Sequence, residues 1–215
     1  INLMGCYAAI HGLKQADAIC RADPSALVLV VCTELCTIHF QENASADNLA
    51  SSLLFGDGAA AMLLSGAESA AGAGIRGFYS EVIPSGRKDM SWELASTGFL
   101  MTLSGYVPDL VESDFLPVMN RALQRYGLTK ELVQGWCIHP GGKRILRAVE
   151  KSMELPETSL AEAYGVLRQY GNMSSPTILY VLKSMLEKGI QGNIIGAAFG
   201  PGLTMETCWL EAGGS

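Results

Sequence analysis

The residues of this 215-residue sequence best suited to chemistry are a cysteine, a histidine and an asparagine. Cys6 follows Gly5 and precedes a helical pattern. The helix dipole and the free backbone N–H groups there favour a thiolate, which would lower the pKa of Cys6 and make it a nucleophile. The same N–H groups could hold an oxyanion. Cys6 is therefore a candidate nucleophile, although most cysteines in apolar segments only pack.

His139 ends an apolar segment, 133–139, which we expect to be a strand, and Pro140-Gly141-Gly142 follow it. The carboxyl edge of a strand is where α/β folds place functional groups, and glycines there let a ligand approach the backbone. Of the other two histidines, His11 lies in the first expected helix and is expected to pack or face solvent. His39 lies near a strand end, where it could line a cavity.

Asn172 stands in a polar turn, Tyr170–Pro176, before a long helical pattern. By itself it is typical of a turn residue, but its amide could donate to an oxyanion, as His139 could through a protonated Nε2. A cysteine that takes an acyl group, with histidine and asparagine donors, suits acyl transfer. Loss of CO2 from a second thioester would supply the carbanion without a general base. A papain-like protease is the competing scheme, but Met4–Ala8 does not resemble its cysteine signature.

Composition excludes several classes of protein. With 49% hydrophobic and 17% charged residues the chain is not disordered, and the low charge indicates a buried sheet or a subunit interface. The net charge of −6 argues against nucleic acid as a partner. The longest apolar run, Ala26–Cys32, is too short to span a membrane, which takes roughly 20 residues.

The first residues, INLMGCYAAI, show no signal-peptide pattern and no initiator Met. We therefore expect a cytoplasmic protein whose chain begins partway through a longer one. The six cysteines stand singly and do not predict a disulfide framework. Cys32 and Cys36 with His39 form the only zinc candidate, and no second ligand pair accompanies them, so we expect no metal site.

Apolar periodicity and turn residues predict alternating helices and strands. The expected helices are 7–22, 47–55, 107–126, 141–153, 160–168 and 174–188, and the expected strands are 26–32, 58–64, 74–83, 99–103, 133–139, 194–199 and 203–210. The continuous apolar run 26–32 is typical of a strand buried on both faces. Residues 84–97 are expected to be a loop, and 41–47 are the nearest approach to a linker. This alternation predicts an α/β protein with helices on the faces of a largely buried sheet.

Longer motifs then carry a resemblance to a known family. They are Gly5-Cys6, Leu54–Ala61 (LFGDGAAA), Ile138–Gly142 (IHPGG), Tyr170–Ser175 (YGNMSS) and Phe199–Thr207 (FGPGLTMET). In these the chain resembles the type III polyketide synthases, the chalcone and stilbene synthase-like condensing enzymes of the thiolase superfamily. The resemblance covers nearly the whole chain. It implies an α/β thiolase-like fold with αβαβα layers and an incomplete N-terminal half: residues 1–55 would be the rest of that half, with the nucleophile, and 56–215 the C-terminal half.

The resemblance also implies an activity. Cys6 matches the acyl-carrying nucleophile, and His139 and Asn172 match the pair that decarboxylates and stabilises the enolate. The chain would then be an acyltransferase that condenses malonyl-CoA iteratively onto an acyl-CoA starter, giving pyrone- or resorcinol-type polyketides. It would act as a cytoplasmic homodimer without a cofactor. The alternatives are a β-ketoacyl-ACP synthase III-like enzyme, whose histidine and asparagine motifs normally differ, and a non-catalytic thiolase-fold dimerisation module.

Residues expected to bind substrate follow from the same resemblance: Phe55, Met101, Cys36, His39, Trp92, Ser174, Gly141, Gly142, Lys143, Arg144, Gly200, Pro201 and Gly202. Phe55 matches a gatekeeping aromatic, whereas Met101 replaces the second gatekeeping Phe of plant members. Trp92 stands where plant enzymes have Gly, and its bulk would shrink or redirect the cavity. Lys143 and Arg144 would lie beside the CoA arm, where they could meet its phosphates or form a solvated helix start.

Overall fold

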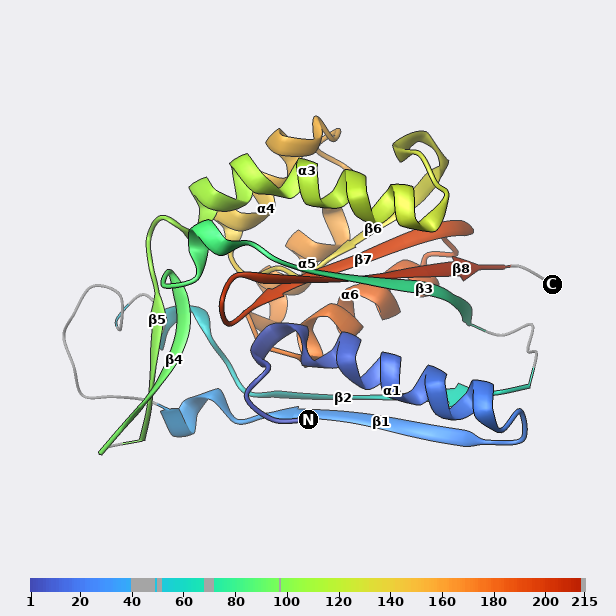
Figure 1. The fold of residues 1–215 in the computed structure, drawn as a ribbon, viewed down its shortest axis with the longest axis horizontal. Helices are drawn as coiled ribbons and strands as arrows, with labels where there is room; N and C mark the ends of the chain where they lie inside the picture. Colours follow the sequence, from blue (N-terminus) through green and yellow to red (C-terminus); the bar gives the residue numbers. More distant parts are fainter. Residues whose placement is uncertain (40–48, 50–51, 68–71, 97, 214–215) are drawn as a thin grey trace.

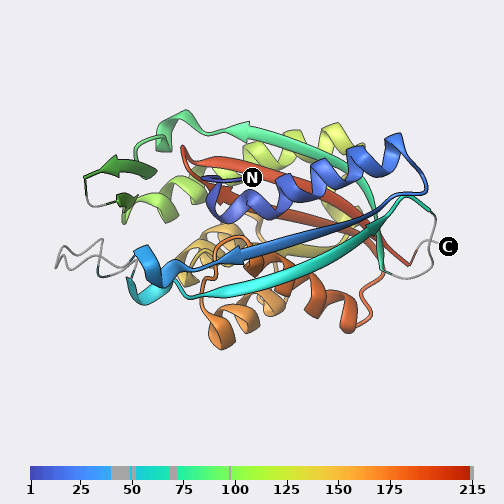
Figure 2. The same cartoon turned by 90° about the horizontal axis from the view of Figure 1, so that it is seen from below.

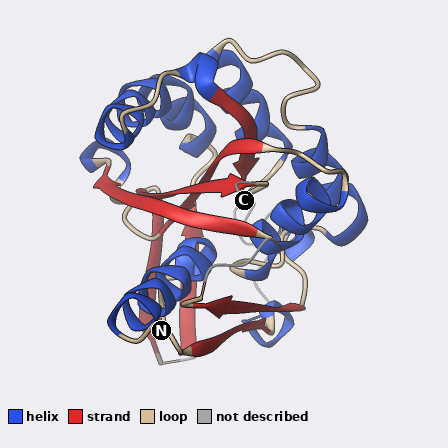
Figure 3. Ribbon diagram, turned by 90° about the vertical axis from the view of Figure 1, so that its right-hand side faces the viewer, coloured by secondary structure: helices blue, strands red, loops and turns tan. Residues whose placement is uncertain are grey.

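The computed structural model describes residues 1–39, 49, 52–67, 72–96 and 98–213. Within these ranges the elements form successive layers (Figure 1). Helices α3 (Val107–Tyr126) and α4 (Lys143–Met153) cover the outer face of a four-stranded sheet, and α1 (Ala8–Ala22) and α6 (Pro176–Glu187) lie beneath it. Below them lies a two-stranded sheet (Figures 1 and 3). The described residues thus supply a helix–sheet–helix–sheet order, in agreement with the expected layered α/β fold.

The four-stranded sheet has the order β3-β8-β7-β6, formed by Ala73–Val82, Thr204–Ala212, Gly192–Gly200 and Val133–Ile138. Strands β6 and β7 are parallel, and the other pairs are antiparallel. The expected strand pair around Gly200–Gly202 is confirmed, with Gly200 opposite Thr204. From Ile194 onward β7 is buried, because helices pack on both faces of the sheet. This buried strand ends at the site described below.

The helices begin and end where local chemistry predicts. Gly127, in the left-handed conformation at φ +70°, ends α3, and Pro176 occupies the first turn of α6. Helix α5 spans Ala161–Tyr170. Single 3₁₀ turns complete the list: η1 (Gly5–Tyr7), η2 (Cys36–His39), η3 (Pro84–Gly86) and η4 (Lys130–Leu132). None of the described helices is long and apolar enough to cross a membrane.

The smaller sheet corrects one expectation. Strand β1 (Leu27–Glu34) pairs antiparallel with β2 (Gly58–Ser65) and is not buried on both faces. Leu27, Leu29 and Val31 are 69%, 61% and 59% exposed. Their neighbours in the strand face α1, and no other described element covers the outer face. An unbroken apolar run therefore reports which side chains are apolar, but not whether both faces are covered.

A second correction concerns residues 84–97, which are not all loop. Strand β4 (Met90–Ala95) pairs antiparallel with the expected strand β5 (Gly98–Leu103). Strand β4 is held by its pairing with β5, which the mixed polar and apolar pattern of its own residues does not reveal. Of the helix expected over 47–55, residue 49 and residues 52–54 are helical, whereas Phe55 forms a β-bridge instead. The other residues of 47–55 and the candidate linker 41–47 lie outside the described part of the chain.

The turn that carries Cys6 packs closely on the end of β7, because Gly200 at that end has no side chain. A Cβ at Gly200 would stand 2.2 Å from the Tyr7 ring and 2.7 Å from the carbonyl oxygen of Met4. Tyr7 is buried there, and Gly5 has a φ of +61°, which glycine adopts without strain. Close approach of η1 to β7 thus requires glycine at both positions.

We expect Gly200→Ala to push the η1 turn away from β7 and so increase access to the Cys6 thiol. Alkylation of Cys6 by iodoacetamide, followed by peptide mass spectrometry, should become several-fold faster. Gly165→Ala is the matched control, because Gly165 lies within α5 and a Cβ there meets nothing within 4 Å. Equal alkylation rates in Gly200→Ala and wild type would contradict this account of the packing.

Candidate active site

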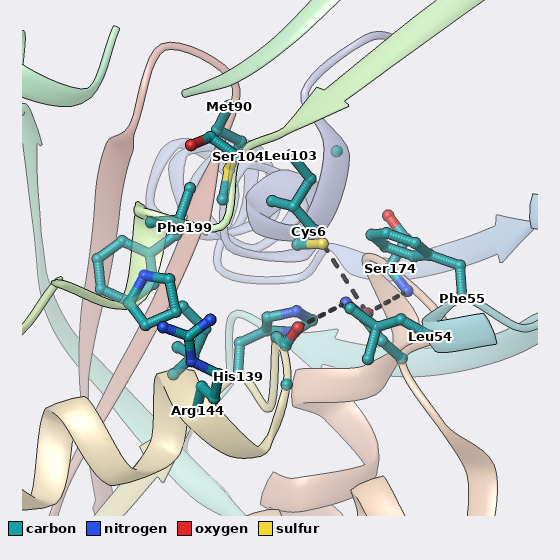
Figure 4. Close-up of a pocket in the computed structure, with 18 of the residues that line it drawn as sticks. Cys6, Leu54, Phe55, Met90, Leu103, Ser104, His139, Arg144, Ser174 and Phe199 are labelled. Carbon is teal, nitrogen blue, oxygen red and sulfur yellow. Dashed lines mark hydrogen bonds between the residues drawn. The ribbon is translucent and has the colours of Figure 1, made fainter. Parts of the chain in front are cut away.

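One cavity of about 350 Å³ brings together residues from distant parts of the chain (Figure 4). Cys6, His139 and Asn172 all line it. Each lies in the segment that leads into a helix: Cys6 before α1, His139 before α4 and Asn172 before α6. The three residues that the sequence singled out separately therefore share one site.

Cys6 lies in η1, and its Sγ is 3.9 Å from Oδ1 of Asn172. Burial raises the pKa of Cys6 to about 12, and hydrogen bonding to Ser174 and Asn172 offsets this only in part. The expected lowering of this pKa is therefore not found, because loss of hydration outweighs the favourable end of the helix. In this structure Cys6 is a thiol that must pass its proton to a neighbour before it can attack.

His139 stands at the end of β6, where its backbone N–H donates to the carbonyl of Ala197 at 2.8 Å. Its side chain is 1% exposed, and neither ring nitrogen has a hydrogen-bond partner among the described residues. Burial lowers the pKa of His139 to about 3, so the ring is neutral at pH 7. A neutral imidazole offers one N–H donor and one acceptor, and in the described residues neither has a partner, although His139 lines the cavity.

Asn172 is held so that its amide orientation is defined. The Ser174 backbone N–H donates to Oδ1 at 2.9 Å, and Nδ2 donates to the carbonyl of Gly141 at 3.5 Å. Because Nδ2 carries two hydrogens, one remains for the cavity. The backbone is held as well: the Asn172 N–H donates to the carbonyl oxygen of Leu54 at 3.1 Å, and the Gly56 N–H donates to the carbonyl oxygen of Asn172 at 2.9 Å.

These two backbone bonds have a second effect. They form a short parallel bridge between Phe55 and Asn172, which places the expected gatekeeping aromatic beside the expected amide donor. Ser174 adopts a φ of +59° in the same turn, an uncommon conformation for a side chain larger than glycine. The turn is thus held in a special shape by contacts on both sides.

Most of the other expected substrate-binding residues line the same cavity: Phe55, Ser174, Gly141, Gly142, Lys143, Arg144, Gly200 and Pro201. Gly202 does not line the cavity, but its N–H donates to the carbonyl oxygen of Met90 at 2.7 Å, and Met90 does line the cavity. Cys36 is in η2, also off the lining, and burial raises its pKa to about 11. The location of these lining residues in the cavity agrees with a role in binding substrate.

The remaining expectations fall partly outside the described residues. Trp92 and Met101 are Cα partners across β4 and β5, and His39 ends η2, but the side chains of all three lie outside the described part. Their effect on the cavity therefore stays a prediction. Within the described ranges no group of three or more His, Cys, Asp or Glu residues is placed to hold a metal ion.

Sequence reasoning missed Glu34 and the wall formed by β4 and β5. Glu34 ends β1 and accepts a hydrogen bond from Ser175 Oγ at 2.5 Å, and its charge raises the pKa of Cys6. The rule that singled out His139, a titratable group at the end of a strand, would also have found Glu34. Met90 and Leu103 line the cavity, but reading 84–97 as a loop concealed the hairpin.

Chemically, the site combines a nucleophile with two donors in a largely apolar enclosure. The thiol can form a thioester, the neutral imidazole can accept its proton, and the imidazole and amide N–H groups can stabilise a developing oxyanion. Lys143 and Arg144 stand at the start of α4, at the edge of this cavity. The arrangement suits acyl transfer from an anionic carrier.

The chain is similar to known proteins over almost its whole length. The family models of chalcone and stilbene synthases match it twice, the N-terminal domain over residues 1–68 and the C-terminal domain over residues 76–212. A putative chalcone synthase from Bacillus subtilis is 35% identical over 94% of this chain and 59% of its own length. An alpha-pyrone synthesis polyketide synthase-like protein from Mycobacterium tuberculosis is 29% identical over 96% of this chain and 55% of its own.

Solved structures agree. The 1,3,6,8-tetrahydroxynaphthalene synthase from Streptomyces coelicolor, a type III polyketide synthase, superposes with a TM-score of 0.92 at 26% identity, over 100% of this chain and 62% of that one. PKS-I from the brown alga Ectocarpus siliculosus superposes with a TM-score of 0.91 at 26% identity, over 97% of this chain and 59% of that one. The chain thus spans less than two thirds of the length of these relatives. Its layered fold and the domains that it matches show that the chain belongs to the chalcone and stilbene synthase family, the type III polyketide synthases.

Proposed function

We propose that this chain carries the active site of an acyltransferase that extends an acyl-CoA starter with malonyl-CoA by decarboxylative Claisen condensation. The observation that supports it most is the convergence of Cys6, His139 and Asn172 on one cavity. Several matched relatives are named for polyketide products, including an alpha-pyrone and a tetrahydroxynaphthalene. This agrees with an iterative enzyme giving pyrone- or resorcinol-type products, more than with a β-ketoacyl-ACP synthase III-like enzyme.

In the loading step the Cys6 thiol passes its proton to the neutral ring of His139, and the thiolate attacks the carbonyl carbon of the starter thioester. The bond from that carbon to Cys6 sulfur forms, the bond to CoA sulfur breaks, and the CoA thiolate takes the proton held by His139, which returns the ring to its neutral form. Burial of both groups favours their neutral forms before substrate binds. A thiolate–imidazolium pair is therefore not the resting state of the site.

In the extension step malonyl-CoA loses CO2, and the electron pair of the broken bond moves onto the thioester as an enolate. The free hydrogen on Nδ2 of Asn172 and an N–H of His139 would stabilise its oxygen. The enolate carbon then attacks the acyl group on Cys6, and the Cys6 thiolate leaves. The lengthened acyl group is then a CoA thioester, and its transfer to Cys6 by the loading step would allow a further extension.

Other parts of the proposal extend the same site. Phe55 would narrow the passage beside Asn172, and Lys143 and Arg144 would meet the phosphates of CoA, since Arg144 is exposed at the cavity edge. The division of the chain into residues 1–55 and 56–215, a homodimeric state and a cytoplasmic location remain proposals. Strand β2, which follows the proposed division, pairs with β1.

Cys6→Ala should abolish covalent loading from a radiolabelled acyl-CoA, because among the described residues no other one that lines the cavity is a thiol. The measurement is acid-stable label on the protein and its peptide location. Cys36→Ala is the control, since Cys36 is also half-buried near the site and should leave the label on Cys6. Label retained on another residue of Cys6→Ala would refute the nucleophile assignment, and a wild-type chain that never loads would favour a non-catalytic module.

Asn172→Asp should impair extension more than loading. The variant keeps an oxygen in place of Oδ1 but exchanges the Nδ2 donor for a carboxylate oxygen that repels an enolate. Malonyl-CoA decarboxylation should fall by about 10²–10³-fold, whereas loading should fall by less than about tenfold. Asn193→Asp is the control, because Asn193 lies at the start of β7 and bonds Leu132 and Trp209 outside the cavity. Equal losses in both steps would contradict the assigned role.

A further inference from the structure

The final motif of the sequence, Phe199–Thr207, is only partly explained by the cavity. Its first residues line the site, but Glu206 on β8 does not, and its side chain is nonetheless buried, with the residue only 3% exposed. A buried carboxylate is costly unless it is paired and hydrogen-bonded. We therefore expect the Glu206 carboxylate to be paired and hydrogen-bonded, and to have a structural or functional role.

Glu206 has three partners. Lys14 forms an ion pair with Oε2, Ser80 Oγ donates to the same oxygen at 2.7 Å, and Nε2 of His11 lies 3.1 Å from Oε1. Lys14 also donates to Ser80 at 2.5 Å. Both carboxylate oxygens are thus occupied, and the group spans three elements: α1, β3 and β8.

Two of the partners belong to the helix that follows the nucleophile. His11 and Lys14 lie on the first two turns of α1, which begins two residues after Cys6. Helix α1 runs beside the larger sheet, along the direction of its strands (Figure 2), and it packs on both β1 and β8. The contacts of Glu206 with His11 and Lys14 therefore restrict movement of the N-terminal end of α1, which is near Cys6, relative to the sheet.

A chain of contacts leads from the carboxylate to the Cys6 turn. His11 packs on Tyr7, with ring centroids 5.3 Å apart, and Tyr7 sits against Gly200. Burial is the main cause of the raised pKa of Tyr7, and the charge of Glu206 adds to it. Tyr7 is the residue next to Cys6. Displacement of α1 would thus move the nucleophile with it.

From this geometry we infer that Glu206, with Lys14 and His11, is a positioning group that holds the Cys6 turn in register with His139 and Asn172. The inference rests on the proposed loading reaction and adds residues outside the cavity to it. Glu206 touches no reacting atom; it acts through α1. Small misplacements of reacting groups cost about 10²-fold in rate, so the effect of losing this group should be measurable.

The test compares Glu206→Gln and Lys14→Met with Lys14→Arg, in single-turnover loading of Cys6 from acyl-CoA. We expect the loading rate to fall by at least about tenfold in the first two, with the acyl-CoA concentration for half-maximal rate changed by less than about threefold. Lys14→Arg keeps the charge and should restore the rate. Glu211→Gln is the matched control, because Glu211 is on the same strand but pairs with Arg76 at the surface.

A role in stability alone is separated by the double variant Lys14→Met/Glu206→Met. Replacing a buried ion pair by apolar groups often preserves stability, so its melting temperature should stay near that of wild type. Loading of Cys6 should remain slow in this variant, because an apolar contact between the two methionines does not set the position of α1 as the three polar contacts of Glu206 do. Loading rates that follow melting temperature across all variants, or equal wild type in folded variants, would overturn the inference.

The outcome also distinguishes the inference from the proposed function. A wild-type chain that does not load Cys6 would refute the proposed function. In that case the rate of Cys6 alkylation by iodoacetamide, which requires no CoA, tests the positioning group. We expect an altered rate in Glu206→Gln and not in Glu211→Gln, and equal rates in all three proteins would overturn the inference.

Discussion

The site depends on a layer of helices that both sheets share. Helices α1 and α6 pack against the larger sheet on one side and against β1 and β2 on the other. Because both start at the same edge of the sheets, the segments just before them, which hold Cys6 and Asn172, meet at one place. His139 joins them from the end of β6. Apolar packing of the shared layer thereby determines where three polar groups lie.

Burial of those groups sets the chemistry. In water a thiol and an imidazole would each ionise near their ordinary pKa values, but here the lack of hydration moves both toward their neutral forms. The backbone contacts of the Asn172 turn hold the remaining donor without using all its hydrogens. The result is a preorganised set of donors that needs little rearrangement when charge develops.

Much of the fold could be predicted from local chemistry. Gly127 and Pro176 mark helix ends through backbone conformation, and the apolar segments flanking Gly200–Gly202 form the expected pair. The position of His139 followed from the general placement of functional groups at strand ends. These signals depend on residues close together in the sequence, so they can be read without a structure.

Other features could not be predicted, because they depend on contacts between distant residues. The exposure of Leu29 depends on what covers β1, and the pKa of Cys6 depends on how much protein surrounds it. The need for glycine at position 200 appears only once Tyr7 is packed against it. Glu206 is similar, since a charged residue in a strand pattern does not reveal a lysine and a histidine on a helix almost two hundred positions earlier.

The start of three helices at one cavity has an electrostatic consequence for the molecule as a whole. The protein carries a formal net charge of −6, which would repel an anionic ligand at long range. Helices α1, α4 and α6 each direct the positive end of a backbone dipole toward the cavity, and two basic side chains stand at the start of α4. In an apolar enclosure such fixed dipoles focus a local positive potential. The surface can thus be acidic, which favours solubility, while the interior of the site still attracts negative charge.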